Sequence, residues 1–203
     1  MKKQLIITAL VYLFTLHLAH AQIGVQGGMV GVFGESFPTA DGLDKLGGAK
    51  GFTVGVFYNV EIAENLSVQP AINWLNKTWK DELDETEFTR MVVNYLEVPV
   101  QLVYTAGEDK GFFVGAGPSF WVGMSGTRTV TIAADTQNSG YALGAPDQEG
   151  RFTLGVNAML GYALEKVVFS VNYGQGLTNQ PDEAQNFGNK NHLALRLGVR
   201  LSQ

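Results

Sequence analysis

Few side chains of this 203-residue chain are of the types that carry out chemistry, and they do not cluster. The chain has no cysteine, and two of its three histidines, His17 and His20, lie at the apolar amino terminus. That leaves His192, at the start of a strand-like segment. A lone histidine there is more often a polar residue at an interface than a general base, since a base needs a reacting group beside it. The sequence therefore predicts that the protein is not an enzyme and has no catalytic residue.

Carboxylates gather between residues 81 and 87, where their hard oxygen ligands could hold a divalent cation. The members of this cluster are Asp81, Glu82, Asp84, Glu85 and Glu87. Their spacing is not that of a calcium-binding loop, so a solvated acidic loop is the simpler interpretation. The glycine-rich stretch at 24–31 lacks the lysine and the strand–loop–helix setting of a phosphate-binding loop. We therefore expect no metal ion and no other cofactor.

Two arginines near the carboxyl end occupy an unusual position for a charged side chain. From Leu193 to Leu201 every second residue is a large aliphatic, and the residues between them are small or cationic, including Arg196 and Arg200. This period of two predicts a β-strand with one apolar and one polar face. Arginines on the polar face fit poorly in the core of a soluble protein. They suit the lumen of a transmembrane barrel, whose outer face meets lipid.

Seven further segments, the first of them weakly patterned, repeat this separation of faces, so eight strands of one domain are predicted. They cover residues 23–33, 51–62, 66–79, 88–104, 111–127, 150–163, 167–174 and 191–201. In one register the large apolar residues point outward, and most strand glycines share the inner face with the polar residues. Those inner polar residues are Asn59, Gln69, Asn73, Glu97, Gln101, Asn157, Ser170, Asn172, Arg196 and Arg200. The fold class is therefore all-β, an eight-stranded antiparallel up-and-down transmembrane β-barrel, because lipid cannot satisfy an open strand edge.

Within such a barrel Glu97 faces Arg196 or Arg200 across the lumen, because their strands are four apart in a ring of eight. The lumen is only just wide enough for its own side chains, so these residues could meet as a structural luminal charge cluster. Pairing would offset the high cost of burying each charge. The alternative is that Glu97 is a solvated carboxylate near the periplasmic end. Bulges or local kinks are expected at the prolines inside strands, namely Pro70, Pro99 and Pro118.

The connections between the strands alternate in length. The tight ones are 63–65, 105–110 and 164–166, and the long or polar ones are 34–50, 80–87, 128–149 and 175–190. Outer-membrane barrels have short turns on the periplasmic side and longer loops outside. The loops at 34–50, 128–149 and 175–190 are therefore expected to face the exterior, where they could bind an extracellular or envelope partner.

The amino terminus has the three parts of a secretory signal peptide. Lys2 and Lys3 form the positive region, residues 5–18 are almost unbroken apolar sequence, and Ala19-His20-Ala21 is a small-x-small cleavage site. The expected organisation is a signal peptide at 1–21 and a barrel domain at 22–203, with a retained anchor as the alternative. Loss of the two lysines moves the formal net charge from −5 to −7, which argues against a nucleic-acid partner. The predicted location is the outer membrane of a Gram-negative bacterium.

Three motifs resemble those of a known family. They are Asn94-Tyr95-Leu96-Glu97-Val98-Pro99-Val100, Gly115-Ala116-Gly117-Pro118 and Tyr173-Gly174-Gln175-Gly176-Leu177-Thr178-Asn179. In this order they are similar to those of the PorT-like, porin-family outer-membrane β-barrel proteins of the Bacteroidota. The resemblance implies a barrel of the small OmpA and OmpX type, inserted into outer-membrane lipid by the barrel assembly machinery. Such chains usually end in an aromatic residue, whereas this one ends in Leu201-Ser202-Gln203.

These observations favour an integral outer-membrane protein with a structural or surface-interaction role through its long external loops. A small passive channel is an alternative, although eight strands leave little open lumen. An outer-membrane enzyme is a weaker alternative, because it would depend on His192. A soluble lipocalin-like cup is the architectural rival, and it would require the apolar faces to point inward.

Overall fold

The computed structural model describes residues 22–32, 49–84, 87–107, 110–132, 135–141, 151–178 and 191–201. The predicted signal peptide lies outside the described residues, as do most of the loops predicted at 34–50 and 175–190. In the acidic cluster at 81–87 no side chain is described, so the expectation for that cluster also lies outside them. Among the described residues, no helix is long and apolar enough to cross a membrane.

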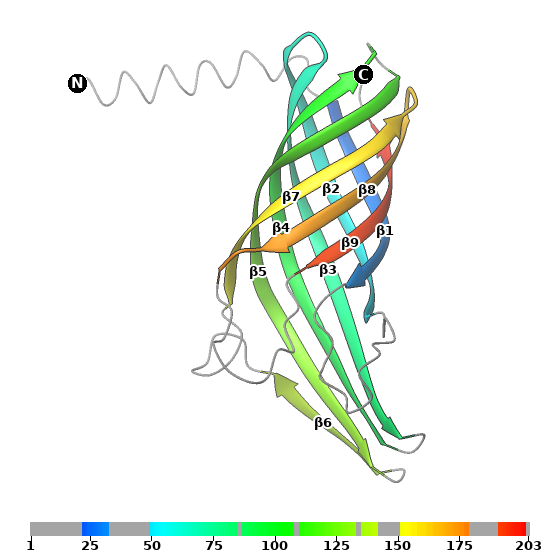
Figure 1. The fold of residues 1–203 in the computed structure, drawn as a ribbon, viewed down its shortest axis with the longest axis vertical. Coiled ribbons are helices and arrows are strands. Elements are labelled where there is room, and N and C mark those ends of the chain that lie inside the picture. Colours follow the sequence, from blue (N-terminus) through cyan, green and yellow to red (C-terminus); the bar gives the residue numbers. More distant parts are fainter. Residues whose placement is uncertain are drawn as a thin grey trace, which may run out of the picture.

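Eight of the nine described strands close into an antiparallel ring (Figure 1). The ring runs β4 (Glu87–Ala106), β3 (Leu66–Asp84), β2 (Ala49–Ala63), β1 (Gln22–Val32), β9 (His192–Arg200), β8 (Val167–Gly176), β7 (Phe152–Ala163) and β5 (Gly111–Ile132), and β5 pairs back to β4. Closure pairs the edge strands with each other, as lipid requires. The predicted eight-stranded antiparallel barrel is therefore confirmed.

The ninth strand, β6 (Asp135–Tyr141), pairs with the far end of β5. In Figure 1, β3, β4 and β5 run past the other strands at one end, and β6 lies along this extension. Most of the segment 80–87 and part of 128–149 are therefore strand, and their prediction as loops is wrong. Pairing to neighbouring strands continues there, and alternate threonines of β5 favour extended backbone. The polarity of these segments marks water-facing strands rather than loops.

The two faces of the barrel strands differ as predicted. On β9, Leu195 and Leu197 are 57% and 49% exposed, whereas Arg196 between them is 4% exposed. The other strands repeat this alternation, since the predicted outward apolar residues are exposed or half-buried and the predicted inner polar residues are buried or half-buried. In a barrel of this size the buried side chains are those that fill the lumen. The apolar faces point outward, which excludes the lipocalin-like cup.

The prolines inside strands do not shift the strand register. Pairing keeps one register past all three, whose cross-strand partners are Val100 for Pro70, Ser119 for Pro99 and Val156 for Pro118. The register shifts in the described strands lie at Glu61–Ala63, Glu82–Asp84 and Asn94–Tyr95. The expectation of bulges at the prolines is therefore wrong, and local kinks without a register shift stay a prediction. The first shift adjoins the turn at 64–65, and the second lies at the end of β3. The third lies where β4 leaves the barrel for the extension, a place where a bulge can bend the strand.

Candidate functional site in the barrel lumen

Glu97, at the middle of β4, is the centre of a polar network inside the barrel. Its side chain is 0% exposed. Its carboxylate accepts hydrogen bonds from Arg196 Nη2 at 2.7 Å, from Asn73 Nδ2 at 3.0 Å and from Asn157 Nδ2 at 3.2 Å. These donors come from β9, β3 and β7, and β9 lies opposite β4 in the ring. The carboxylate is thus paired and enclosed, and the alternative of a solvated Glu97 near the periplasm does not hold.

Further amide side chains extend the network around the lumen. Gln26 Nε2 on β1 donates to Asn73 Oδ1 at 2.7 Å, and Gln101 Nε2 on β4 donates to Asn157 Oδ1 at 2.7 Å. The guanidinium bound to Glu97 also donates from Nη1 to Asn172 Oδ1 on β8, at 3.3 Å. The side-chain oxygens of Asn73, Asn157 and Asn172 therefore each accept a hydrogen bond inside the barrel, which offsets the cost of burying them.

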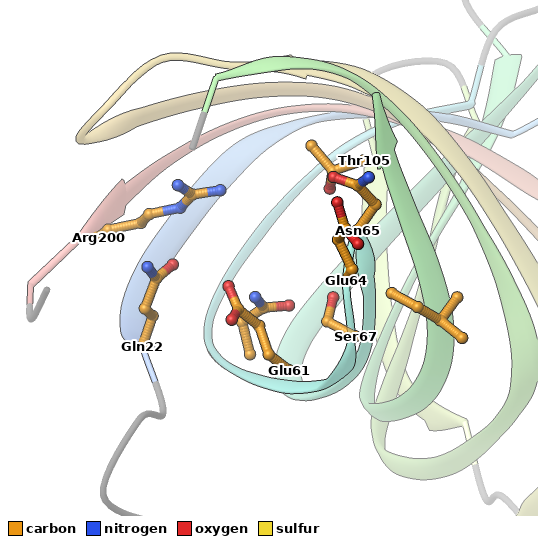
Figure 2. A pocket seen from close by; sticks show the side chains of 9 residues that line it. Gln22, Glu61, Glu64, Asn65, Ser67, Thr105 and Arg200 are labelled. Atoms are coloured by element: carbon orange, nitrogen blue, oxygen red, sulfur yellow. The ribbon is translucent and has the colours of Figure 1, made fainter. Parts of the chain in front are cut away.

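Arg200, the other arginine of the predicted charge cluster, lies away from Glu97. Arg200 is four residues beyond Arg196 on β9, about 13 Å along an extended strand. It lines the mouth of the barrel with Glu61 and Glu64, at the end where the short turns lie (Figure 2). The structure therefore brings Glu97 and Arg196 together and leaves Arg200 out of this cluster.

The lumen also contains two titratable residues, His192 and Lys77, whose position there is not predicted from the sequence. His192 is 0% exposed, its Nε2 lies 3.3 Å from Glu97 Oε1, and its ring centre lies 5.3 Å from that of Trp121. The Nζ atom of Lys77 lies 4.7 Å from the centre of the Trp121 ring and 5.1 Å from that of Tyr95. Cations at such distances are attracted to the electron-rich face of an aromatic ring. The interpretation of His192 as an interfacial residue is therefore wrong.

The alternation of inner and outer residues along a strand is enough to assign Lys77 and His192 to the lumen. Lys77 lies four positions after Asn73 on β3, and His192 lies four positions before Arg196 on β9. Residues an even number of positions apart on a strand share a face, so both belong to the inner face. The position of Lys77 at a predicted strand end, beside a polar segment, concealed this assignment.

Glycines opposite aromatic or imidazole rings create the space that the luminal side chains occupy. In three cross-strand pairs a Cβ on the glycine would lie 2.1–2.4 Å from a ring atom of its partner. These pairs are Gly24 with Phe57, Gly161 with Phe113 and Gly174 with His192. The inner-face glycines are therefore part of the packing of a narrow lumen.

Two apolar layers enclose the polar network along the barrel axis. The layer toward the short turns consists of Val103, Phe113, Met159 and Ala163, with Val168 packed against it. The layer toward the extension consists of Val30, Leu75, Met91, Val93, Tyr95, Trp121 and Ala194. The arrangement holds charges in fixed places within a filled lumen. In the described part of the chain, no three His, Cys, Asp or Glu side chains converge as metal ligands would.

The outer surface carries two levels of aromatic side chains. Near the short turns, Phe112 and Tyr162 pack edge to face with ring centres 4.9 Å apart, and Phe120 and Phe152 lie 6.2 Å apart near the extension. The two levels are eight residues apart on β5 and ten on β7. At about 3.3 Å per residue and a strand tilt of about 40°, the separation is roughly 20–25 Å. This is close to the apolar band of about 25 Å that outer-membrane barrels place in lipid.

Beyond the outer aromatic level the same face becomes polar. Asn76 Nδ2 donates to Asn94 Oδ1 at 2.8 Å, and Asn94 Nδ2 donates to Ser125 Oγ at 3.0 Å. This row joins β3, β4 and β5 one step beyond Trp74, Leu96 and Val122. Because polar side chains are costly in hydrocarbon and favoured in water, the row marks where the sheet leaves the apolar band.

A closed ring of eight strands with an apolar outer belt and a filled interior defines an integral β-barrel membrane protein. Residues 18–180 match the family described as outer membrane protein beta-barrel domain, and the chain belongs to this family. It is therefore a protein of the Gram-negative outer membrane, with its barrel in lipid.

Solved structures with low similarity include three bacterial outer-membrane or surface proteins. Ail of Yersinia pestis is 13% identical, with 89% of this chain and 95% of that chain covered and a TM-score of 0.45. OprG of Pseudomonas aeruginosa is 12% identical, with 90% and 97% covered and a TM-score of 0.44. Neisserial surface protein A is 12% identical, with 89% and 95% covered and a TM-score of 0.41. Among curated proteins no match was found.

Proposed function

We propose that this protein has a structural or surface-interaction role carried by the part of the barrel that extends beyond the membrane. The observation that supports this role is the continuation of β3, β4 and β5, with β6 along their side, past the polar row that ends the apolar belt. The alternation of short turns and long connections supports an external position for this extension.

The edge formed by β6 supports an interaction with a partner. Residues 135–140 are exposed, and in the described part of the chain β6 pairs with β5 alone. Thr129 Oγ1 donates to Asn138 Oδ1 at 2.7 Å, and the hydroxyls of Thr131 and Thr136 are 3.2 Å apart, so side chains as well as backbone hold β6 in place. An ordered strand edge presents backbone N–H and C=O groups to an extended segment of another chain.

The two alternative functions, a passive channel and an enzyme, have less support than the surface role. The polar network and its two apolar layers fill the lumen, which argues against a wide pore. His192 lies in the lumen against Glu97 and Trp121, away from the external surface, which argues against hydrolytic chemistry there.

Within its family we propose that the chain is a PorT-like, porin-family protein of the Bacteroidota. Its Asn94–Val100 motif supplies the boundary residue Asn94, the buried Tyr95 and the central Glu97. We expect the barrel assembly machinery to insert it. We also expect the unidentified extracellular or envelope partner to bind through the loops at 34–50 and 175–190 and through the segment 128–149, which contains the β5–β6 hairpin.

The surface role can be tested with a photo-crosslinker attached to a single cysteine, since the native chain has none. A probe at Asn138 on intact cells should give discrete adducts of higher mass. The same probe at Lys166, on a short turn at the opposite end, should not give these adducts. Identical adduct patterns at both positions, or none at Asn138, would contradict a specific partner for the β5–β6 hairpin.

A further inference from the structure

The outward face of the sheet changes from apolar to cationic where it leaves the apolar belt. Phe52 on β2 and Trp74 on β3, which are 53% and 37% exposed, lie at the end of the belt. Lys50 lies two residues beyond Phe52 on the same face and pairs with Thr78 of β3. Arg90 lies further out, on the exposed face of β4. Both cations are exposed and lie just past the apolar surface.

Hydroxyl and amide side chains lie beside these cations. Thr78 Oγ1 donates to Asn76 Oδ1 at 3.3 Å, and Asn76 begins the hydrogen-bonded row that continues through Asn94 to Ser125. Each of these side chains therefore has a fixed neighbour, and each is half-buried or exposed. Because hydroxyl and amide groups both donate and accept hydrogen bonds, the row suits the hydroxyl groups of a sugar.

The exposed charges differ between the two ends of the barrel. Among the exposed side chains that the structure describes at the extension end, Lys50, Arg90 and Arg151 are cationic. Asp135 is anionic, and it lies at the far end of the β5–β6 hairpin. The exposed charges described at the short-turn end are of both signs, namely Glu61, Glu64, Glu165, Lys110 and Lys166. Cations thus predominate at the boundary nearest the extension, and lysine and arginine at a membrane surface attract anionic lipid headgroups.

We propose that the headgroup of a phosphorylated glycolipid binds at this boundary. The residues of this headgroup surface are Lys50, Asn76, Thr78, Arg90 and Asn94. The strand register places the Cα atoms of Lys50 and Arg90 about 12 Å apart across two strands, so both long side chains can reach the phosphate groups of one headgroup. Charge-assisted hydrogen bonds to phosphate are among the strong ones in proteins. The sugar hydroxyls would meet the amide and hydroxyl side chains, and the acyl chains would lie along Phe52 and Trp74.

The external leaflet of a Gram-negative outer membrane consists largely of phosphorylated glycolipid, so the ligand is abundant on that side. The placement of the headgroup surface in this leaflet rests on the external position proposed for the extension. The headgroup chemistry does not rest on it, because it follows from the side chains alone.

The test measures lipid binding to the purified barrel in detergent by native mass spectrometry. The probes are diphosphoryl lipid A, its dephosphorylated form, and phosphatidylglycerol, an anionic lipid without a sugar. Diphosphoryl lipid A should bind more tightly than either. Lys50→Gln and Arg90→Gln should each weaken its binding roughly fivefold, and Lys50→Arg should bind it like the wild type. Lys166→Gln is the matched control, because Lys166 is an exposed cation at the opposite end and its loss should leave binding unchanged.

The proposal is overturned if the dephosphorylated form or phosphatidylglycerol binds as tightly as diphosphoryl lipid A. It is also overturned if Lys166→Gln weakens binding as much as Lys50→Gln. The lipid series requires wild-type protein alone, so it decides the headgroup chemistry even if a variant does not fold. An inverted barrel, detected by labelling the β5–β6 hairpin on intact cells, would overturn the external leaflet and the surface role together. Absence of lipid A binding in detergent would overturn this proposal alone.

Discussion

Glu97 is the residue at which the luminal interactions converge, and it is the most informative single position to change. In Glu97→Gln an amide nitrogen replaces one of the oxygens that accept from Arg196, Asn73 and Asn157, and the guanidinium loses its counter-charge. Breaking a buried ion pair costs about 3–5 kcal/mol, against about 0–1 kcal/mol for an exposed one. We expect a clear fall in the urea unfolding midpoint in detergent.

A second substitution separates the charge pair from simple packing. Adding Arg196→Met should restore part of the lost stability, because the stranded cation is removed with the side chain. Leu195→Met is the control on the same strand, since Leu195 is 57% exposed on the lipid face and the swap should cost little. A neutral Glu97→Gln, or double-mutant losses that merely add, would mean that the pair contributes nothing to stability.

At the scale of elements, the β5–β6 hairpin and the short turns should lie on opposite sides of the membrane. Because the native chain has no cysteine, Asn138→Cys and Lys166→Cys each provide a single labelling site. We expect a membrane-impermeant maleimide to label residue 138 on intact cells, since residues 135–140 are exposed on the extension. Residue 166 should react only after the outer membrane is permeabilised. The reverse pattern would invert the orientation of the barrel.

Across the whole molecule, the sequence predicts the barrel well because its period of two is local information. The sequence of each strand shows which of its residues share the apolar face. If that face meets lipid, the sheet must close into a barrel, because lipid cannot satisfy an open strand edge. The extension was harder to predict, because polar residues such as Thr127, Thr129 and Asn138 indicate a loop unless their pairing partners are known. The choice between Arg196 and Arg200 also required three-dimensional information. Both share the inner face, and only the stagger between strands places one of them opposite Glu97.

The filled lumen leads to a prediction for the intact protein in a planar bilayer. Side chains from β1, β3, β4, β7, β8 and β9 join in one hydrogen-bonded network, with an apolar layer on each side of it. A hydrated ion would have to displace paired charges and then pass between packed apolar side chains, both at high cost. We therefore expect little or no steady conductance from protein whose folding is verified by its heat-dependent shift in gel mobility. Large, reproducible single-channel steps would contradict the closed lumen and favour the porin alternative.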